Sequence, residues 1–185
     1  TLMLFSRDTE RPGLGRTASA MAVFLLGFGA LEIHIVFPAL ATGWCLLYAP
    51  GRWKRTLPYW AVSGLYFVLH QTVAVKPTEG PYAMHWDVEM GRTLVRYFGT
   101  ALAGGRILGP WRLPEWSWVA AAWVAGLVLV AVAGAAWRKG HRAAVFGLLW
   151  FAVTIAPVLP LRDHFSPYYV AIPAAGLAMA IAGVV

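Results

Sequence analysis

Long apolar stretches separated by short polar segments most constrain how this chain folds. A helix needs roughly twenty apolar residues, at about 1.5 Å of rise each, to cross the hydrocarbon core of a bilayer. Residues 17–31, 33–49, 57–75, 116–137, 143–160 and 167–185 are apolar enough to be read as such helices. With 59% hydrophobic and only 12% charged residues, the chain lies outside the range of ordinary soluble domains. We therefore expect an all-α, polytopic transmembrane helical bundle that forms a single domain.

The region from Thr17 to Tyr48 allows two interpretations. It is too long for one ordinary span, and Glu32, His34 and Pro38 interrupt it. We interpret it as two short helices that meet near Glu32, and the alternative is one tilted span. The choice decides on which side of the membrane the following basic residues lie.

Basic residues give the orientation, because Lys and Arg in short loops are retained on the cytoplasmic side. With two helices before residue 51, three basic clusters fall on one side and hold nine Lys or Arg against two acids, whereas the opposite side holds six of each. The clusters are Arg7, Arg11 and Arg16; Arg52, Lys54 and Arg55; and Arg138, Lys139 and Arg142. A single tilted span would remove this bias. The net charge of +7 is thus a signal of topology that places the basic loops in the cytoplasm, and we expect no nucleic-acid partner.

The longest polar segment, residues 76–115, is expected on the outer face. Within it, residues 92–104 carry apolar side chains at helical spacing, and Arg92 and Arg96 lie one turn apart. This pattern predicts an amphipathic helix in the outer membrane interface. Functional residues are concentrated in such connecting segments.

Ionisable side chains expected on the outer face form a candidate polar site. They are Glu32, His34, His85, Asp87, Glu89, Asp163 and His164. A carboxylate within a membrane stretch is costly unless it faces a cavity or a partner, which favours a role for Glu32, and a hydrated turn is the alternative. The acids near His85 could act as a general base or hold a divalent cation, and a solvated loop is the alternative. The histidines lack the spacing of a zinc site.

Three arginines are candidate ligands of a lipid phosphate, because guanidinium groups bind phosphate in a bidentate manner. They are Arg92, Arg96 and Arg162. Arg162 lies in the polar segment 161–169, where a headgroup could bind, and an interfacial connector with a belt of tyrosines is the alternative. Membrane lipids are the expected partners in both cases.

Three segments carry a family likeness. They are Leu25 to Pro38; Arg52 to Arg55 with Leu57 and Pro58 and the long polar loop after them; and Phe146 to Pro160 with Tyr168 to Gly176. In this order they resemble the later membrane part of the GT-C class of polytopic glycosyltransferases, in the protein O-mannosyltransferase-like branch that carries tetratricopeptide repeats. The residues that match the family's motifs are Glu32, Pro38, Tyr169, Pro173 and Gly176. Ala30 and Leu31 stand where the family has Ser and Lys. Pro167 and Tyr168 stand where it has Glu and Arg.

The resemblance implies that the full protein moves a sugar from a polyprenyl-phosphate carrier to a protein or glycan acceptor on the extracytoplasmic face, in a bacterial inner membrane. A base would deprotonate the acceptor while cationic groups hold the departing lipid phosphate. The family's acidic motif would lie upstream of Thr1, and we expect this chain to be a piece of a longer polypeptide, so the catalytic carboxylate is not expected here. Glu32 would orient a partner across the cavity.

Two other functions stay open. The replaced motif residues favour a non-catalytic membrane scaffold or lipid-binding protein. A transporter would have discontinuous helices with charges near the bilayer midplane, whereas the charges here gather at the expected outer surface.

Overall fold

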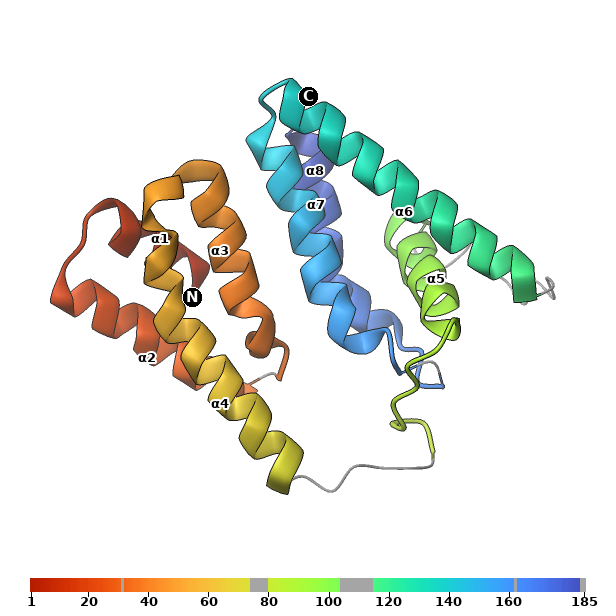
Figure 1. Cartoon of the computed structure of the whole chain (residues 1–185), viewed down its shortest axis with the longest axis horizontal. Coiled ribbons are helices and arrows are strands. Elements are labelled where there is room, and N and C mark those ends of the chain that lie inside the picture. The colour runs from red at the N-terminus through yellow and green to blue at the C-terminus, as the bar shows by residue number, and fades with distance from the viewer. Residues whose placement is uncertain (31, 74–79, 104–114, 162, 184–185) are drawn as a thin grey trace. The chain divides into compact units, whose positions relative to one another are not determined.

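The structure is a computed structural model that describes residues 1–30, 32–73, 80–103, 115–161 and 163–183. In these residues the chain is helical and contains no strand, which confirms the predicted all-α class for the described part of the chain. The chain divides into two compact units, Thr1–Ala74 and Val75–Val185. Figure 1 draws the first unit in red to yellow and the second in green to blue.

The first unit alternates α-helices with short 3-10 helices. Its described elements are α1 (Leu2–Glu10), α2 (Leu14–Ala30), η1 (Glu32–Val36), α3 (Phe37–Tyr48), η2 (Pro50–Thr56) and α4 (Leu57–Val73). In the described residues, α2 and α3 are thus separate helices, and η1 directly precedes α3. Pro38 lies in the first turn of α3, where its missing backbone N–H would have no helical partner in any case.

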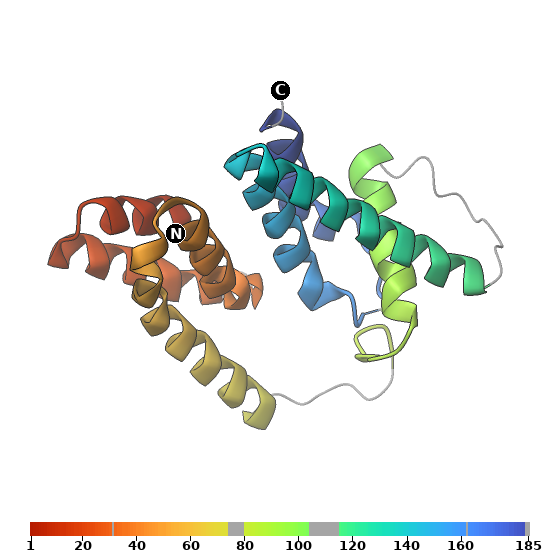
Figure 2. The same ribbon diagram turned by 45° about the horizontal axis from the view of Figure 1, so that its top comes forward.

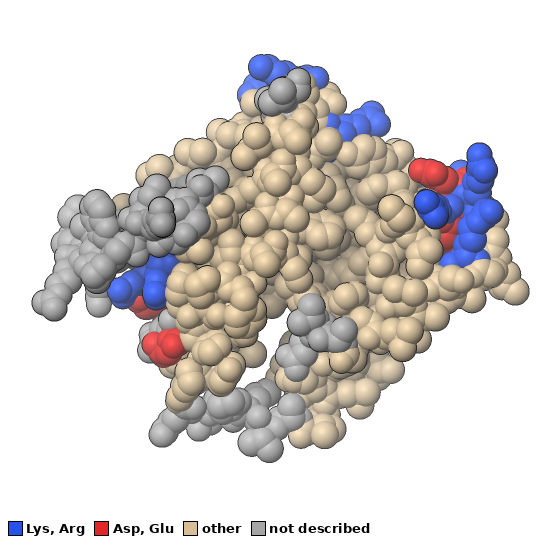
Figure 3. Space-filling model, turned by 180° about the vertical axis from the view of Figure 1, so that it is seen from behind, with Lys and Arg blue, Asp and Glu red and all other residues tan. Residues whose placement is uncertain are grey.

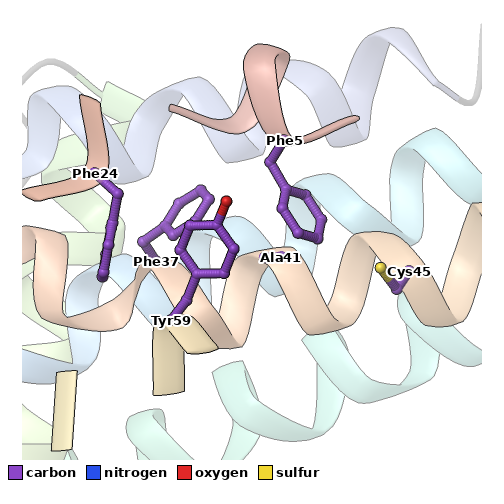
Figure 4. Packing of buried hydrophobic residues seen from close by; sticks show 6 residues of the cluster. All are labelled: Phe5, Phe24, Phe37, Ala41, Cys45 and Tyr59. Atoms are coloured by element: carbon purple, nitrogen blue, oxygen red, sulfur yellow. The ribbon is translucent and has the colours of Figure 1, made fainter. Parts of the chain in front are cut away.

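An aromatic cluster forms the core of the first unit (Figure 4). The ring of Tyr59 on α4 lies 5.4 Å from the ring of Phe5, 5.1 Å from Phe24 and 5.3 Å from Phe37, in edge-to-face geometry. All four residues are buried. Each such ring pair adds about 0.5–1.5 kcal/mol to the free energy gained by burial. One cluster therefore holds α1, α2, α3 and α4 together.

A buried carboxylate holds the polar end of the first unit. Asp8 accepts hydrogen bonds from the hydroxyl of Thr17 at 2.9 Å and from the backbone N–H of Gly13 at 3.4 Å. It also forms an ion pair with Arg55 at 3.4 Å. These contacts bring the first two basic clusters, residues 7–16 and 52–55, to the same end of this unit.

The second unit contains the longest described helix. Its elements are α5 (Glu89–Ala103), α6 (Glu115–Arg138), α7 (Arg142–Ile155), η3 (Ala156–Val158), η4 (Pro167–Val170) and α8 (Ala171–Ala182). The turn from α6 to α7 is made by Gly140, whose φ of 77° is readily available only to glycine. Beyond it, the N–H of His141 donates to the carbonyl of Ala136 at 2.8 Å and closes the end of α6.

Helices α7 and α8 lie side by side in both ribbon views (Figures 1 and 2). Their backbones approach so closely that a Cβ atom at Gly176 would lie 2.5 Å from the carbonyl oxygen of Gly147. The indole N–H of Trp150 also donates to the carbonyl of Ile172 at 2.9 Å across the pair. Small residues that allow such an approach are typical of packed membrane helices.

The apolar side of α5 packs within the second unit. Leu94, Phe98 and Ala101 contact a buried cluster that includes Tyr97 of α5, Phe151 of α7 and Leu177 of α8. The amphipathic pattern of residues 92–104 was predicted to face the membrane interface. The same pattern also fits a helix that covers other helices, and the contacts of α5 are of this second kind.

Within the described residues the predicted apolar stretches coincide with helices, and three of the stretches also contain a short 3-10 helix. These are η1, which ends before Pro38; η3, which contains Pro157; and η4, which begins at Pro167. A proline is tolerated in the first turn of a helix, where its missing N–H has no helical partner. Among the described residues, no helix combines the length and the apolar character that crossing a membrane requires. On the face shown in Figure 3, charged side chains are confined to small patches, and wide areas carry none.

Replacement of Gly147 by alanine tests the close approach of α7 and α8. The new Cβ would meet backbone atoms, which cannot move aside as a flexible side chain can. We expect Gly147→Ala to lower the free energy of unfolding, measured in denaturant, by about 1–3 kcal/mol. The control is Gly134→Ala in α6, where nothing lies within 4 Å, so the same change should be neutral or should stabilise the helix. Equal effects at both glycines would contradict the close packing.

Removal of the Asp8 carboxylate tests the polar network of the first unit. Asp8→Ala leaves Thr17 and Arg55 without their partner, so we expect a loss of about 1–3 kcal/mol in the free energy of unfolding. Glu10→Ala, at an exposed position two residues away, is the control and should change it by less than about 0.5 kcal/mol. An Asp8→Ala variant as stable as the control would show that the network contributes nothing.

Candidate functional site

The candidate site is built on the first two turns of α5. Asp87 lies just before the helix, and its carboxylate accepts a hydrogen bond from the backbone N–H of Glu89 at 2.9 Å. This contact satisfies one of the N–H groups that lack a helical partner at a helix start. Glu89, Arg92 and Arg96 then follow at intervals of three and four residues, so their side chains lie on one side of the helix.

These side chains face a hollow of about 550 Å³. We name the residues 159–166, which lead from η3 to η4, the connector, and Asp163 of the connector completes the hollow. The lining residues are Asp87, Val88, Glu89, Arg92, Thr93, Arg96 and Asp163. Ligand pockets in proteins commonly have volumes of about 300–1,000 Å³. The size and the charged lining of the hollow suit a small polar ligand or headgroup.

The two arginines of the hollow differ in their partners. Arg92 forms an ion pair with Glu89 at 3.4 Å, one turn earlier on α5. The guanidinium of Arg96 lies 4.3 Å from the centre of the Phe165 ring and, within the described part of the chain, forms no ion pair. Burial lowers the pKa of Arg96, and the nearby charge of Arg92 lowers it further. Arg96 is therefore a half-buried cation beside the hollow, and no carboxylate of the described residues forms an ion pair with it.

The segment before α5 is tied to the connector through His85. Its Nε2 lies 3.4 Å from a carboxylate oxygen of Asp163, a contact that is an ion pair when the imidazole is protonated. Its backbone N–H donates to the carbonyl of Pro160 at 2.9 Å. His85 thus holds Asp163 at the hollow without lining the hollow itself.

Tyr97 of α5 contacts the connector at two of its residues, Phe165 and Ser166. Its side chain is fully buried, and its hydroxyl accepts a hydrogen bond from the backbone N–H of Ser166 at 3.4 Å. Its ring also packs against the ring of Phe165, with the centres 4.9 Å apart. Burial raises the pKa of Tyr97, so the hydroxyl stays neutral at physiological pH.

His164 lies next to the hollow but points to an aromatic group. Its ring is 4.3 Å from the ring of Tyr82 and 5.9 Å from that of Tyr169. Of the tyrosines considered as an interfacial belt, Tyr168 and Tyr169 contact each other with ring centres 4.2 Å apart, and Tyr169 also contacts this histidine. A direct role of His164 in binding within the hollow is not supported by these contacts.

The predicted site residues are brought together only in part. The residues Asp87, Glu89, Arg92, Arg96 and Asp163 line one hollow, and His85 contacts Asp163. His34 lies in the first unit, where its Nε2 is 3.4 Å from the hydroxyl of Thr1 and its Nδ1 is buried without a partner among the described atoms. The side chain of Glu32 and the whole of Arg162 lie outside the described residues, so their predicted roles stay predictions.

Three residues of the site were not singled out from the sequence. Thr93 follows Glu89 by one helical turn and could have been found from that spacing, and its hydroxyl donates to the carbonyl of Glu89 at 3.2 Å. Tyr97 and Phe165 have no local signal. Their contact joins segments that are far apart in the chain, and a single sequence contains no pattern that predicts it.

A divalent cation was a further possibility for the acids near His85. In the described ranges, no three side chains of His, Cys, Asp or Glu lie close enough together to hold a metal ion. The carboxylates of the hollow are instead engaged with an N–H group, an arginine and a histidine.

Comparisons of the chain with models of protein families, with curated proteins and with solved structures find no match. The function is therefore argued from the chemistry of the hollow and from the surface of the helices.

Proposed function

We propose that this chain is part of a membrane glycosyltransferase that moves a sugar from a polyprenyl-phosphate donor to an acceptor on the extracytoplasmic face, and that the hollow beside α5 binds the donor's phosphate. One observation carries this proposal. The guanidinium of Arg96 is half-buried beside the hollow and has no ion pair within the described residues. An anion in the hollow would supply the missing counter-charge.

The chemistry of the hollow favours a phosphate group over other anions. Arginine presents planar, paired N–H donors that match the oxygens of phosphate. Arg92 and Arg96 are four residues apart on one helix, so both guanidinium groups can approach one ligand. When the sugar departs, negative charge develops on the lipid phosphate. Fixed cations beside the phosphate lower the energy of this transition state.

Exposed apolar side chains support a lipid environment. On α6, Trp123 is 71%, Leu127 66% and Val130 71% exposed. On α4, Leu65 and Phe67 are 61% and 52% exposed. Apolar surface of this extent on soluble proteins marks an interaction site, and lipid chains would cover it in a bilayer.

The position of the charges supports an orientation for each unit. In the first unit, the Asp8 to Arg55 contact places two basic clusters at one end. In the second, the basic residues 138–142 precede α7, whereas the connector and the hollow follow it. With the basic ends in the cytoplasm, the hollow would open to the extracytoplasmic face.

A non-catalytic lipid-binding protein is the second candidate. The residues Ala30, Leu31, Pro167 and Tyr168 favour it, since they replace the polar and charged residues of the family that the chain resembles. Such a protein would use the same hollow for a lipid phosphate and would transfer no sugar.

Arg96→Gln tests the phosphate site in the full-length protein in detergent. The variant keeps much of the side chain but removes its charge, so we expect its affinity for farnesyl phosphate, a short soluble polyprenyl phosphate, to fall by about tenfold or more. Arg138→Gln, an exposed arginine at the end of α6, should leave the affinity unchanged. Calorimetric titration with farnesyl phosphate and with uncharged farnesol measures both. Unchanged binding in Arg96→Gln would refute the site.

Sugar transfer in the same two variants separates the candidates. An enzyme should lose transfer from a polyprenyl-phosphate donor in Arg96→Gln and keep it in Arg138→Gln. Binding of farnesyl phosphate without any transfer by the unaltered protein would favour the lipid-binding alternative.

Labelling of single cysteines tests the orientation of the first unit. His34 precedes α3 and Lys54 follows it, so the two positions lie at opposite ends of this helix. In whole cells we expect a membrane-impermeant thiol reagent to label His34→Cys from outside, whereas Lys54→Cys should react only after the cells are opened. The native Cys45 is buried and can be replaced by serine to remove background. Labelling of both positions from the same side would overturn the topology.

A further inference from the structure

We propose that Phe165 is a positioning residue that holds the guanidinium of Arg96 in the orientation in which it binds a lipid phosphate. This inference rests on the proposed phosphate-binding function of the hollow. It concerns a residue of the connector that does not line the hollow and that reaches the ligand only through Arg96.

The contact between Phe165 and Arg96 is a cation–π contact, with the guanidinium carbon over the face of the ring. The guanidinium carbon lies 4.3 Å from the centre of the ring, within the range of a cation–π interaction. A guanidinium that stacks through its face keeps its N–H donors in the plane of the group, where they are available to phosphate oxygens. The ring therefore restrains Arg96 without consuming the donors that a ligand needs.

Arg92 shows the contrasting case on the same helix. Its Nη1 lies 3.4 Å from a carboxylate oxygen of Glu89, so a carboxylate already competes for its donors. A ligand that binds Arg92 must share it with Glu89, whereas a ligand that binds Arg96 displaces no carboxylate of the described residues. We infer that Arg96 contributes more to phosphate binding than Arg92 does.

The Phe165 ring is itself held in place by a contact with the buried residue Tyr97. It packs against the ring of Tyr97, whose hydroxyl accepts the N–H of Ser166, the next residue of the connector. Tyr97 is fully buried, so its ring cannot move without disturbing the core of the second unit. A long arginine side chain loses considerable rotamer freedom when a ligand orders it. The supported ring reduces this loss by ordering Arg96 in advance.

A double-mutant cycle with farnesyl phosphate tests the inference, again in the full-length protein in detergent. Phe165→Leu removes the ring and keeps an apolar side chain, and we expect about fivefold weaker binding. In an Arg96→Gln background the same change should have no further effect, because the group that Phe165 positions is gone. A merely structural role of Phe165 would weaken binding in both backgrounds. Phe165→Tyr retains the ring and should bind as the unaltered protein does.

Phe98→Leu provides the matched control. Phe98 lies on α5 in the same apolar cluster, and its ring contacts Phe151 at 5.8 Å rather than Arg96. Loss of this ring should leave the affinity for farnesyl phosphate unchanged. Thermal unfolding of each variant identifies any that does not fold, and in that case the Phe165→Tyr and Phe165→Trp variants carry the test. Weaker binding in these two ring-bearing variants would overturn the inference.

The outcomes separate this inference from the proposed function. If the unaltered protein binds farnesyl phosphate no better than farnesol, the phosphate site is refuted, and the role of Phe165 is refuted with it. If it binds farnesyl phosphate and Phe165→Leu has no effect, or an equal effect in both backgrounds, only the role of Phe165 is refuted. Inorganic phosphate, tested in parallel, should bind far more weakly, and equal affinity would identify free phosphate as the ligand and refute a lipid donor.

Discussion

The close approach of α7 and α8 determines where the site of the second unit lies. At Gly147 and Gly176 the two backbones are in contact, and the indole of Trp150 joins them by a further hydrogen bond. Because the two helices are held together along their length, the connector between them starts and ends at fixed places. It meets α5 through Tyr97, which positions Asp163 and Phe165 beside the first turns of that helix. The polar site therefore depends on the packing of apolar and small residues.

The charges of the hollow are balanced unevenly. Asp87 caps the start of α5, Glu89 pairs with Arg92, and Asp163 lies near His85. Arg96 contacts an aromatic ring instead, and a ring attracts a cation without neutralising its charge. Partial burial of this charge costs free energy, as the lowered pKa of Arg96 indicates. A ligand with negative charge would offset this cost at Arg96, so the hollow is better suited to an anion than its three carboxylates and two arginines suggest.

The sequence predicts the features of this chain that depend on local patterns. Apolar stretches predict the helices, the interruption near Pro38 predicts that α3 is a separate helix, and the spacing of Arg92 and Arg96 places both on one side of α5. The contacts of Phe165 and His85 join distant segments and leave no local pattern. Amphipathic spacing also does not distinguish a helix that faces lipid from one that faces protein, which is why the packing of α5 was not foreseen.

The difference between Arg92 and Arg96 bears on whether the proposed site serves transfer or only binding. A scaffold gains nothing from binding the products of transfer more tightly than the donor, whereas catalysis requires interactions that strengthen as the reaction proceeds. A sugar linked to a lipid phosphate is a diester with one negative charge, and departure of the sugar leaves a monoester that gains a second. For a cation already paired with a carboxylate, the attraction to the phosphate grows little with this increase in charge, because the carboxylate offsets part of the cation's field. Arg96 contacts the Phe165 ring and has no ion pair in the described residues. Its attraction to the phosphate therefore grows more with the second charge. In the proposed transfer reaction, this property would let Arg96 stabilise the departing lipid phosphate more than the bound donor.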